Sequence, residues 1–421
     1  MFSLDNFLVK KYYNDFHCSV KELFFFVSYI LYISVMICKE SFLEHVIFLD
    51  NDAFFKCILL FCLLLLFLKE LYGATFDCKN IIYLTIIFCL SVLIKNVAHF
   101  ATAISLFYFF SSRNVSFKRI AKVTLWITII WLSLIVGLSL VGIIENYHYQ
   151  MESIRPREFI GFRYALYAPA FLFNVVALCV FVYREKVHFF VILIEIIVNY
   201  WMYEKTDSRM SYYFTLIMIF LTIMLKVKKP IKMFASEKRI YVNGIMGKVV
   251  KYGFVFSFAL CAVISIVVSI KYSPSNSFLR KLNSKLLQRL AYSKMSYEEY
   301  GVSLFGKNIN WIGNGLRADG KASTKSILYV DNVYLQFLQH YGIVFFCLVM
   351  AVLIYGEYRL LKEKEYLLLF INLIIAFHAV LDDLVMHIWY NTFWFAIVPL
   401  VFSGVKSLYA LFEYKKKYYY L

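Results

Sequence analysis

Long apolar stretches, separated by short polar turns, recur along almost the whole chain. A transmembrane α-helix needs about 20 mostly apolar residues to cross a bilayer, and about twelve stretches approach or reach that length. Their centres lie near Tyr29, Leu63, Ile86, Ser105, Ser133, Phe173, Ile194, Ile217, Leu260, Phe345, Leu373 and Phe395. Only Lys95 and Asn96 separate the third stretch from the fourth. The pattern predicts an all-α, polytopic integral membrane protein with about twelve transmembrane helices.

One polar segment, residues 271–331, interrupts this pattern and contains ten Lys or Arg against four Asp or Glu. No other gap between apolar stretches is large enough for a separate soluble domain. We therefore expect residues 1–421 to form a single membrane domain in which residues 271–331 are one large external loop. A basic surface beside a membrane favours an anionic ligand.

Within this loop, Asn276 and Ser277 are typical helix caps and predict a helix that runs to about Met295. Apolar residues recur at helical spacing at Leu279, Leu282, Leu286 and Leu290, accompanied by Lys281, Lys285 and Arg289. Two compatible interpretations stay open. The cations reach lipid phosphates from an interfacial helix, or Arg289 contacts a diphosphate ligand at the membrane surface.

Lysine and arginine are enriched in alternate loops, which the positive-inside rule assigns to the cytoplasm. These basic residues are Arg113, Lys118, Arg119, Lys122, Lys226, Lys228, Lys229, Lys232, Lys238, Arg239, Lys248, Lys251, Arg359, Lys362, Lys364, Lys415, Lys416 and Lys417. The loop at residues 39–52 is acidic instead and is expected outside. This orientation predicts that both termini are cytoplasmic and that residues 271–331 are external.

Composition and cysteine spacing argue against several classes of function. The chain is 62% apolar and carries a net charge of +17, much of which is the cytoplasmic bias of a membrane protein. No basic stripe on a soluble module points to nucleic acid. The nine cysteines all lie outside the large loop, and their spacing indicates neither a disulfide framework nor a Cys/His metal site.

Arginines gather at two predicted external positions. Arg155, Arg157 and Arg163 precede the sixth apolar stretch, and Arg209 precedes the eighth. An arginine at a helix end is usually a snorkelling anchor or the partner of a nearby acid. Several on the same face favour a ligand with phosphate groups, because guanidinium groups bind phosphate oxygens bidentately. Such a cluster can stabilise a diphosphate leaving group without a metal.

A second polar group surrounds the last external turn and consists of His378, Asp382, Asp383 and His387. Ionisable groups near membrane spans often mark function. The spacing is compatible with a metal, but a short loop between helices also needs polar residues. Sugar binding and assistance to a catalytic base are further roles that stay open for this group.

Four stretches in order resemble the bacterial Wzy-type polymerases, which join lipid-linked oligosaccharide repeat units of O-antigen, capsule or exopolysaccharide. They are Arg157 with Gly161-Phe162; Thr206 with Ser208-Arg209; Leu282-Asn283, Arg289-Leu290 and Leu304-Phe305-Gly306; and Asp331-Asn332-Val333-Tyr334-Leu335 with Tyr341-Gly342-Ile343. The O-antigen ligases are more distantly similar. No single stretch is specific, so their order and the late large loop carry the resemblance over nearly the whole chain. Arg163-Tyr164 departs from the family pattern, in which a polar residue followed by Pro-Asn is expected.

The resemblance implies a GT-C-like glycosyltransferase on the external face of the bacterial cytoplasmic membrane, with no cofactor. A growing glycan on undecaprenyl diphosphate is transferred to a hydroxyl of a repeat unit on a second undecaprenyl diphosphate. Asp331 is the expected base, and Arg289 and Arg209 are expected to stabilise the leaving group. The expected substrate-binding residues are Arg157, Arg163, Arg317, Asn332, His378 and Asp382. The implied partners are the bilayer, a flippase and a chain-length regulator.

Alternatives stay open at this point. Asp331 can instead cap the helix that follows it, and Glu298, Glu299 and Asp319 are substitutes for it as a base. A lipid-linked oligosaccharide flippase would also have about twelve spans, although its charges would lie inside the bundle. A ligase would share the motifs and differ only in its acceptor.

Overall fold

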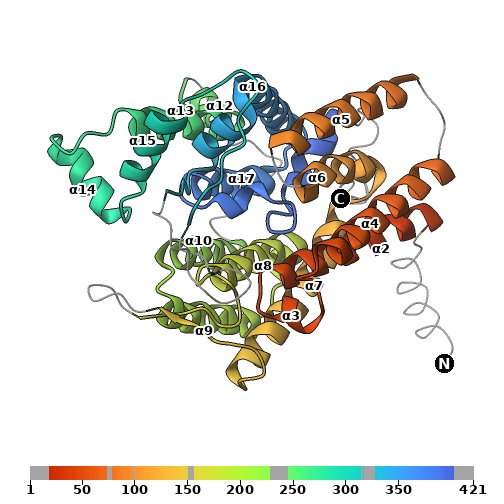
Figure 1. The fold of residues 1–421 in the computed structure, drawn as a ribbon, viewed down its shortest axis with the longest axis horizontal. Coiled ribbons are helices and arrows are strands. Elements are labelled where there is room, and N and C mark those ends of the chain that lie inside the picture. The colour runs from red at the N-terminus through yellow and green to blue at the C-terminus, as the bar shows by residue number, and fades with distance from the viewer. Residues whose placement is uncertain are drawn as a thin grey trace.

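Helices make up nearly all of the regular structure in the computed structural model, which describes residues 19–73, 78–97, 100–149, 156–227, 245–313, 316 and 328–402 (Figure 1). The first half contains α2 (Val20–Lys39), α3 (Leu43–Val46), α4 (Asp52–Gly73), α5 (Cys78–Val97), α6 (Phe100–Ser111), η1 (Ser112–Asn114), α7 (Phe117–Leu140), α8 (Tyr167–Tyr183), η2 (Arg184–Lys186), α9 (Phe189–Thr206) and α10 (Arg209–Lys226). The second half contains α12 (Ile245–Val255), α13 (Ser257–Ile270), α14 (Ser277–Lys285), α15 (Arg289–Tyr300), α16 (Val333–Lys362), α17 (Tyr366–His378), η3 (Asp383–Met386), α18 (Trp394–Ile397) and η4 (Val398–Val401). Within the described ranges the strands are β1 (His148–Tyr149) and β2 (Arg157–Glu158), which pair antiparallel.

All twelve predicted centres lie inside helices, but the helices differ in their capacity to cross a membrane. Five are long and apolar enough: Val20–Lys39, Phe117–Leu140, Tyr167–Lys186, Arg209–Lys226 and Val333–Lys362. A sixth span is possible if the pair Val249–Val255 and Ser257–Ile270, bent by 76°, counts as one. The stretch around Phe395 forms only the four-residue α18 before Pro399 opens η4. The described residues therefore show a mostly helical chain with five or six helices that can span a membrane.

Ion pairs between the termini of neighbouring helices identify the two ends of the bundle. One, which we call the Glu70 end, holds Glu70 with Arg113 at 2.7 Å, Glu22 with Arg119 at 2.9 Å and Arg184 with Glu365 at 3.4 Å. The other, the Asp331 end, holds Lys39 with Glu44 at 3.6 Å, Lys205 with Glu158 at 2.8 Å and Arg289 with Asp331 at 2.7 Å. The loops predicted to be external thus meet at the Asp331 end.

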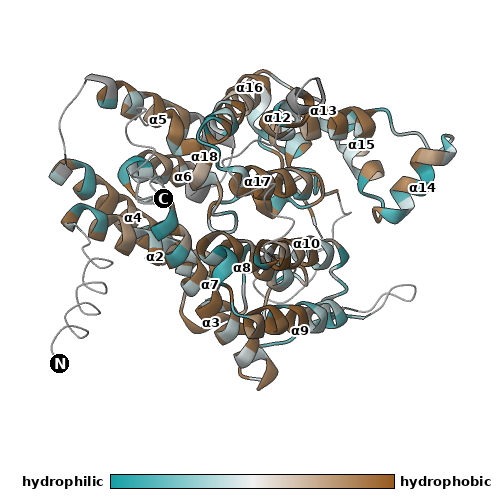
Figure 2. Cartoon of the chain, turned by 180° about the vertical axis from the view of Figure 1, so that it is seen from behind, coloured by the Kyte–Doolittle hydropathy of each residue, from teal (hydrophilic) through white to brown (hydrophobic). Residues whose placement is uncertain are grey.

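Helix α8 lies at the centre of the bundle, where it packs between α7 and α10. Nearly all of its side chains are buried, whereas α9 exposes one apolar side chain after another, such as Phe190 and Ile197. Figure 2 shows that α8 and α9 both belong to a largely brown, apolar helical body. Because α8 is enclosed on all sides, the loop at its N-terminal end is held at the centre of the Asp331 end.

The predicted helix from Asn276 to about Met295 is two helices. Asn276 caps α14 as predicted, because its Oδ1 accepts from the backbone N–H groups of Phe278 and Leu279 at 3.0 and 3.1 Å. Leu287 and Gln288 then adopt left-handed backbone conformations, with φ of 53° and 68°. Two such residues in succession end the helical path, and α15 starts in a new direction at Arg289.

A break in α16 receives the segment that follows α15. Gly342 has a φ of +86° and interrupts α16. The joining hydrogen bonds run from the N–H of Ile343 to Ser303 O at 3.0 Å, from Val344 to Leu304 O at 3.1 Å and from Lys307 to His340 O at 3.1 Å. Backbone groups freed by the interrupted helix are satisfied by this neighbouring segment, as buried backbone requires.

Two glycines make this docking possible. A Cβ on Gly342 would lie 2.3 Å from the backbone nitrogen of Gly306, and a Cβ on Gly306 would lie 2.1 Å from the carbonyl oxygen of His340. Both glycines also have positive φ, a conformation that glycine adopts without steric cost. The stretches Leu304-Phe305-Gly306 and Tyr341-Gly342-Ile343, which entered the family resemblance separately, therefore form one contact.

We expect Gly342→Ala to lower the free energy of unfolding by at least about 2 kcal/mol, because the added Cβ combines left-handed strain with a backbone clash. Gly137→Ala in α7 is the matched control, since nothing lies within 4 Å of the position that a Cβ would take there and its φ is not in the left-handed region. Thermal unfolding in detergent measures both variants. Equal melting temperatures for the two would contradict the role of the glycine contact.

Candidate functional site

Arg289 and Asp331, both predicted to be catalytic, form an ion pair at the Asp331 end. The Arg289 Nε donates to Asp331 Oδ2 at 2.7 Å, and the two side chains are 17% and 24% exposed. Burial alone would lower the pKa of Arg289, but the charge and hydrogen bond of Asp331 raise it above its ordinary value. The guanidinium is therefore a permanent cation, and both members of the pair remain accessible from one side.

The break between α14 and α15 places Arg289 at this point. Asn283, buried at the end of α14, accepts with Oδ1 from the N–H groups of Leu290 and Ala291 at 3.0 and 3.1 Å. This side chain satisfies backbone donors that the first turn of α15 would otherwise leave unpaired. Its Nδ2 donates to Tyr272 Oη at 3.0 Å, which ties the same turn to the end of α13.

A second contact fixes α15 against α16. Gln339 of α16 accepts from Ser296 Oγ at 2.8 Å and donates to the carbonyl oxygens of Ser296 and Gly301 at 3.0 and 3.2 Å. All of these groups are buried or nearly so. Arg289 precedes Ser296 by seven residues and Asp331 precedes Gln339 by eight, so these bonds hold the start of α15 beside the segment that leads into α16.

Asn332, and not Asp331, caps α16. The Asn332 Oδ1 accepts from the N–H groups of Tyr334 and Leu335 at 3.0 and 3.4 Å. The Asn332 side chain is buried, and the substrate-binding role predicted for it stays a prediction. The capping alternative for Asp331 is wrong, and the Asp331 carboxylate is directed to Arg289 instead.

Tyr164 lies among four of the predicted residues. Its side chain is half-buried, and this burial raises its pKa. The negative charges of Asp331 and Asp382 act in the same direction, and the positive charges of Arg289 and Arg157 oppose it. These electrostatic contacts place acids and arginines from the loop before α8, from α15 and from the starts of α16 and η3 around one phenol. Sequence reasoning missed Tyr164 as a site residue, although it stands where the family pattern is broken.

Arg157 and Arg209 share one acid. Asp207 ends α9 in a left-handed conformation, and its two oxygens lie 4.0 Å from Arg157 Nη2 and 3.4 Å from Arg209 Nε. Asp207 is almost completely buried, whereas the Arg209 side chain is 59% exposed. Asp207 was not predicted to belong to the site. The sequence did offer an indication, because Asp207 lies between Arg157 and Arg209, which were expected to come together, and neighbouring cations need an acid close by.

The polar group at the last turn divides into two pairs. His378 is fully buried against Phe173, and its Nε2 lies 3.1 Å from Asp382 Oδ2. Burial raises the pKa of Asp382, but the hydrogen bond and charge of His378 bring it below its ordinary value. Asp383 accepts a hydrogen bond from the Tyr329 hydroxyl. Burial, followed by repulsion from Asp382, raises the pKa of Asp383 to about 7.

The remaining member of that group lies apart from these pairs, because His387 stacks on Trp389 at 5.2 Å. Within the described ranges, no group of three or more His, Cys, Asp or Glu residues could hold a metal ion. His378 and Asp382, both predicted to bind substrate, form a pair. The Asp382 carboxylate also interacts electrostatically with Tyr164 and Arg289.

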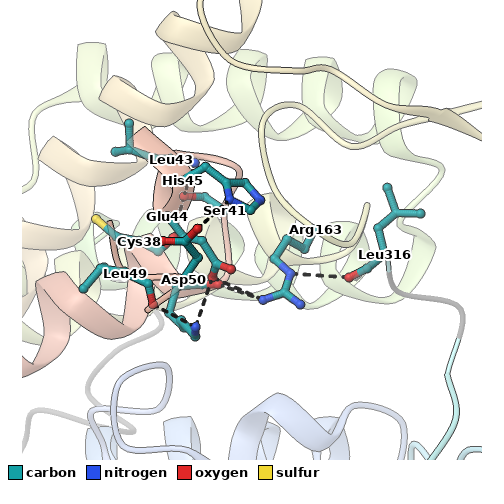
Figure 3. Close-up of polar contacts among 10 residues, drawn as sticks. Cys38, Ser41, Leu43, Glu44, His45, Leu49, Asp50, Arg163 and Leu316 are labelled. Atoms are coloured by element: carbon teal, nitrogen blue, oxygen red, sulfur yellow. Dashed lines mark hydrogen bonds and ion pairs between the residues drawn. The ribbon is translucent and has the colours of Figure 1, made fainter. Parts of the chain in front are cut away.

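Arg163 connects three segments of the chain through hydrogen bonds (Figure 3). Its Nη1 contacts Glu44 Oε2 at 3.3 Å and the Lys39 carbonyl oxygen at 3.2 Å, and its Nε donates to the Leu316 carbonyl oxygen at 3.4 Å. The Leu316 N–H donates back to Arg163 O at 2.8 Å. These bonds join the end of α2, the loop before α8 and the large loop. Arg163 contacts none of the charged groups around Tyr164 through these bonds, and its substrate-binding role stays a prediction.

The other residues singled out in the sequence add little. Arg155, Arg317 and Asp319 lie outside the described residues. Glu298, a substitute for the base, pairs with Lys294 at 3.5 Å on an exposed face of α15.

The arginines at the centre of the site are all paired with acids. Arg289 has Asp331, and Arg157 and Arg209 share Asp207. Burial or half-burial of an ion pair costs the desolvation free energy of both charged groups. A ligand that competes for the cation must therefore supply the charge and hydrogen bonds of the acid that it displaces. An anionic group with several oxygens does this, because it accepts from more than one guanidinium at a time. The geometry therefore suits a multivalent anion presented beside acidic side chains.

No protein-family model matches the chain, and neither the curated proteins nor the solved structures contain a match.

We expect Asn283→Ala to lower the free energy of unfolding by about 2 kcal/mol, since it removes the cap of α15 at a buried position. Asn276→Ala removes the corresponding cap of α14, which is exposed, and should cost only about 1 kcal/mol or less. Thermal unfolding of both variants in detergent makes the comparison. A larger loss for Asn276→Ala would show that Asn283 does not organise α15.

We expect Asp383 to make the folded protein less stable as pH rises towards neutrality. Because its pKa is raised from 3.8 to about 7, the folded protein holds a proton that the unfolded chain has released, so stability falls across that window. Asp383→Asn should flatten this slope and raise the melting temperature on the alkaline side only. Asp52→Asn, at an exposed position, is the control. An unchanged slope in Asp383→Asn would contradict the assignment.

Proposed function

We propose that this chain is a Wzy-type polymerase, a membrane glycosyltransferase that joins lipid-linked oligosaccharide repeat units. In this proposal it is a GT-C-like protein of about twelve spans in a bacterial cytoplasmic membrane. Helices outside this set, such as α5, α6 and α17, complete the spans, since length and composition together support only five or six helices. Both termini and the Glu70 end are cytoplasmic, and the Asp331 end is external.

The observation that carries the proposal is the ion pair between Arg289 and Asp331, with Tyr164, Arg157 and Asp382 beside it. Glycosyl transfer from a lipid diphosphate needs cations where the diphosphate leaves and a proton acceptor where the hydroxyl attacks. Residues that supply both lie here within contact of one another, at the end of the bundle where the large loop begins and ends. Neither a scaffold nor a flippase requires this arrangement.

The proposed reaction gives each of these residues a role. The acceptor hydroxyl oxygen attacks the anomeric carbon of the donor glycan and gives its proton to Asp331. The bond between the anomeric carbon and the diphosphate oxygen breaks, and its electron pair stays on the departing undecaprenyl diphosphate. Arg289, Arg157 and Arg209 offset the charge that grows on this group.

The shared position of Arg289 couples the two roles. While Arg289 holds Asp331 at 2.7 Å, the guanidinium occupies the carboxylate oxygen Oδ2. A diphosphate bound by Arg289 draws the guanidinium away from Asp331. In this proposal the donor therefore frees this oxygen to receive the proton of the acceptor hydroxyl.

The acceptor saccharide has suitable partners on the other flank. Tyr329 binds Asp383 and lies 6.4 Å from the ring of Trp311, which in turn lies 5.8 Å from Tyr300. A Cβ on Gly313 would lie 3.0 Å from the Tyr329 ring, so the backbone there packs flat against the aromatic face. Aromatic rings beside carboxyl groups are the usual surroundings of sugar rings and their hydroxyls. A flippase and a chain-length regulator are the proposed protein partners.

The test deletes the gene in its host and restores it as wild type, Asp331→Asn or Arg289→Ala at matched protein levels. We expect the deletion strain to display single repeat units without long chains, and both variants to lose the polysaccharide ladder on a gel by at least about a hundredfold. Arg184→Ala, which breaks an arginine pair at the Glu70 end, is the control and should restore the ladder.

The other outcomes separate the rival functions. Full-length glycan that accumulates on its lipid carrier in the deletion strain would indicate a ligase. Repeat units trapped on the cytoplasmic side would indicate a flippase. A full ladder from Asp331→Asn would remove Asp331 as the base.

A further inference from the structure

Helix α14 is the element that the proposed reaction leaves unexplained. It lies at the edge of the molecule, away from the helical body, and Figures 1 and 2 agree on this position. Among the described elements, its contacts are made chiefly with α15. A nine-residue helix with so few neighbours is too short to be stable in water by itself.

The exposed residues of α14 have a distinctive chemistry. Arg280, Lys281 and Lys285 are all exposed, and the helix contains no acid. Phe278 is also exposed, at 70%. Residues three and seven positions apart lie on the same stripe of a helix, so Phe278, Lys281 and Lys285 form one exposed stripe that combines an aromatic ring with two lysines.

The inner stripe of α14 is different. Leu279, Leu282 and Leu286 are half-buried, and Asn283 is buried in the cap of α15. The apolar face of α14 is therefore already in use against the protein, and the exposed phenylalanine and lysines have no partner among the described residues. An occupant of this stripe must accept both a ring and positive charge.

The position of α14 identifies that occupant. Helix α13 ends at Ile270 and belongs to the bent pair that is apolar enough to span a membrane. Only six residues, 271–276, separate it from α14, and they reach at most about 20 Å when extended. The helix is thus tethered within reach of the membrane surface, where aromatic rings enter the interface and lysines extend to phosphate groups.

We infer that α14 is an interfacial helix that binds anionic lipid headgroups through Lys281 and Lys285, with Phe278 inserted between the lipids. Two left-handed residues separate this surface from Arg289. The break lets one basic sequence serve two places: α14 holds lipid, and α15 holds Arg289 in the site. This inference needs the membrane-spanning helices but does not depend on the proposed reaction.

The test measures hydrogen–deuterium exchange of the full chain in nanodiscs of phosphatidylcholine, with and without phosphatidylglycerol. Amides of residues 277–285 should exchange more slowly in the anionic bilayer, and high salt should remove the difference. A lysine near an anionic surface contributes about 1 kcal/mol, or about fivefold per residue. Lys281→Glu combined with Lys285→Glu should abolish the slowing in the anionic bilayer. Phe278→Ser should make the amides of α14 exchange faster in both bilayers.

Lys118→Glu combined with Lys186→Glu makes the same change of charge at exposed positions of the Glu70 end and should leave exchange in α14 unchanged. Circular dichroism and size-exclusion profiles show whether each variant is folded. Equal exchange of α14 in neutral and anionic bilayers would overturn the inference. So would slowing that persists when both lysines are replaced by glutamate.

Discussion

The cost of an unpaired charge in low-dielectric surroundings determines how the Asp331 end is built. Removing one partner of a buried ion pair destabilises a protein by several kcal/mol, because the other charge is left uncompensated. The arginines around Tyr164 accordingly meet Asp331 and Asp207. The pairs of Arg289 with Asp331 and of Arg157 with Asp207 join segments distant in the sequence. The charges that suit the site to chemistry are therefore also the contacts that hold its loops together, and a substitution at any of them changes both.

Backbone breaks place these charges. A continuous helix from Asn276 onward would carry Arg289 along the axis of α14, away from α16. The left-handed residues Leu287 and Gln288 redirect the chain, and Asn283 compensates the broken turn by capping α15. Gly342 has the same effect in α16, where the interrupted helix exchanges hydrogen bonds with the segment after α15. The chain thus changes direction at these two breaks, and the helical segments on either side of each stay regular.

The helical elements were predicted well from the sequence, because long apolar stretches mark segments that are removed from water. All twelve predicted centres fall in helices, and Asn276 caps its helix as expected. The break at Leu287 was not predictable, since neither leucine nor glutamine favours a left-handed conformation. The short α18 reflects Pro399, whose effect on the helix path depends on tertiary neighbours. The total number of membrane spans stays a prediction beyond the five or six that length and composition support.

The site was predictable in its residue types and less so in its pairings. Arginines and acids in external loops were visible, but which acid meets which arginine depends on contacts such as the 42-residue separation between Arg289 and Asp331. Asn332 illustrates the difference: a polar residue in a motif was expected to bind substrate, and its side-chain oxygen caps α16. Because Asn332 and not Asp331 is the cap, the Asp331 carboxylate is available to an arginine. An anion that attracts the Arg289 guanidinium more strongly than one carboxylate does would separate Arg289 from Asp331 without any movement of the helices, since only two side chains need to part. In the proposed reaction, this single shared ion pair would therefore link binding of the donor to the release of Asp331.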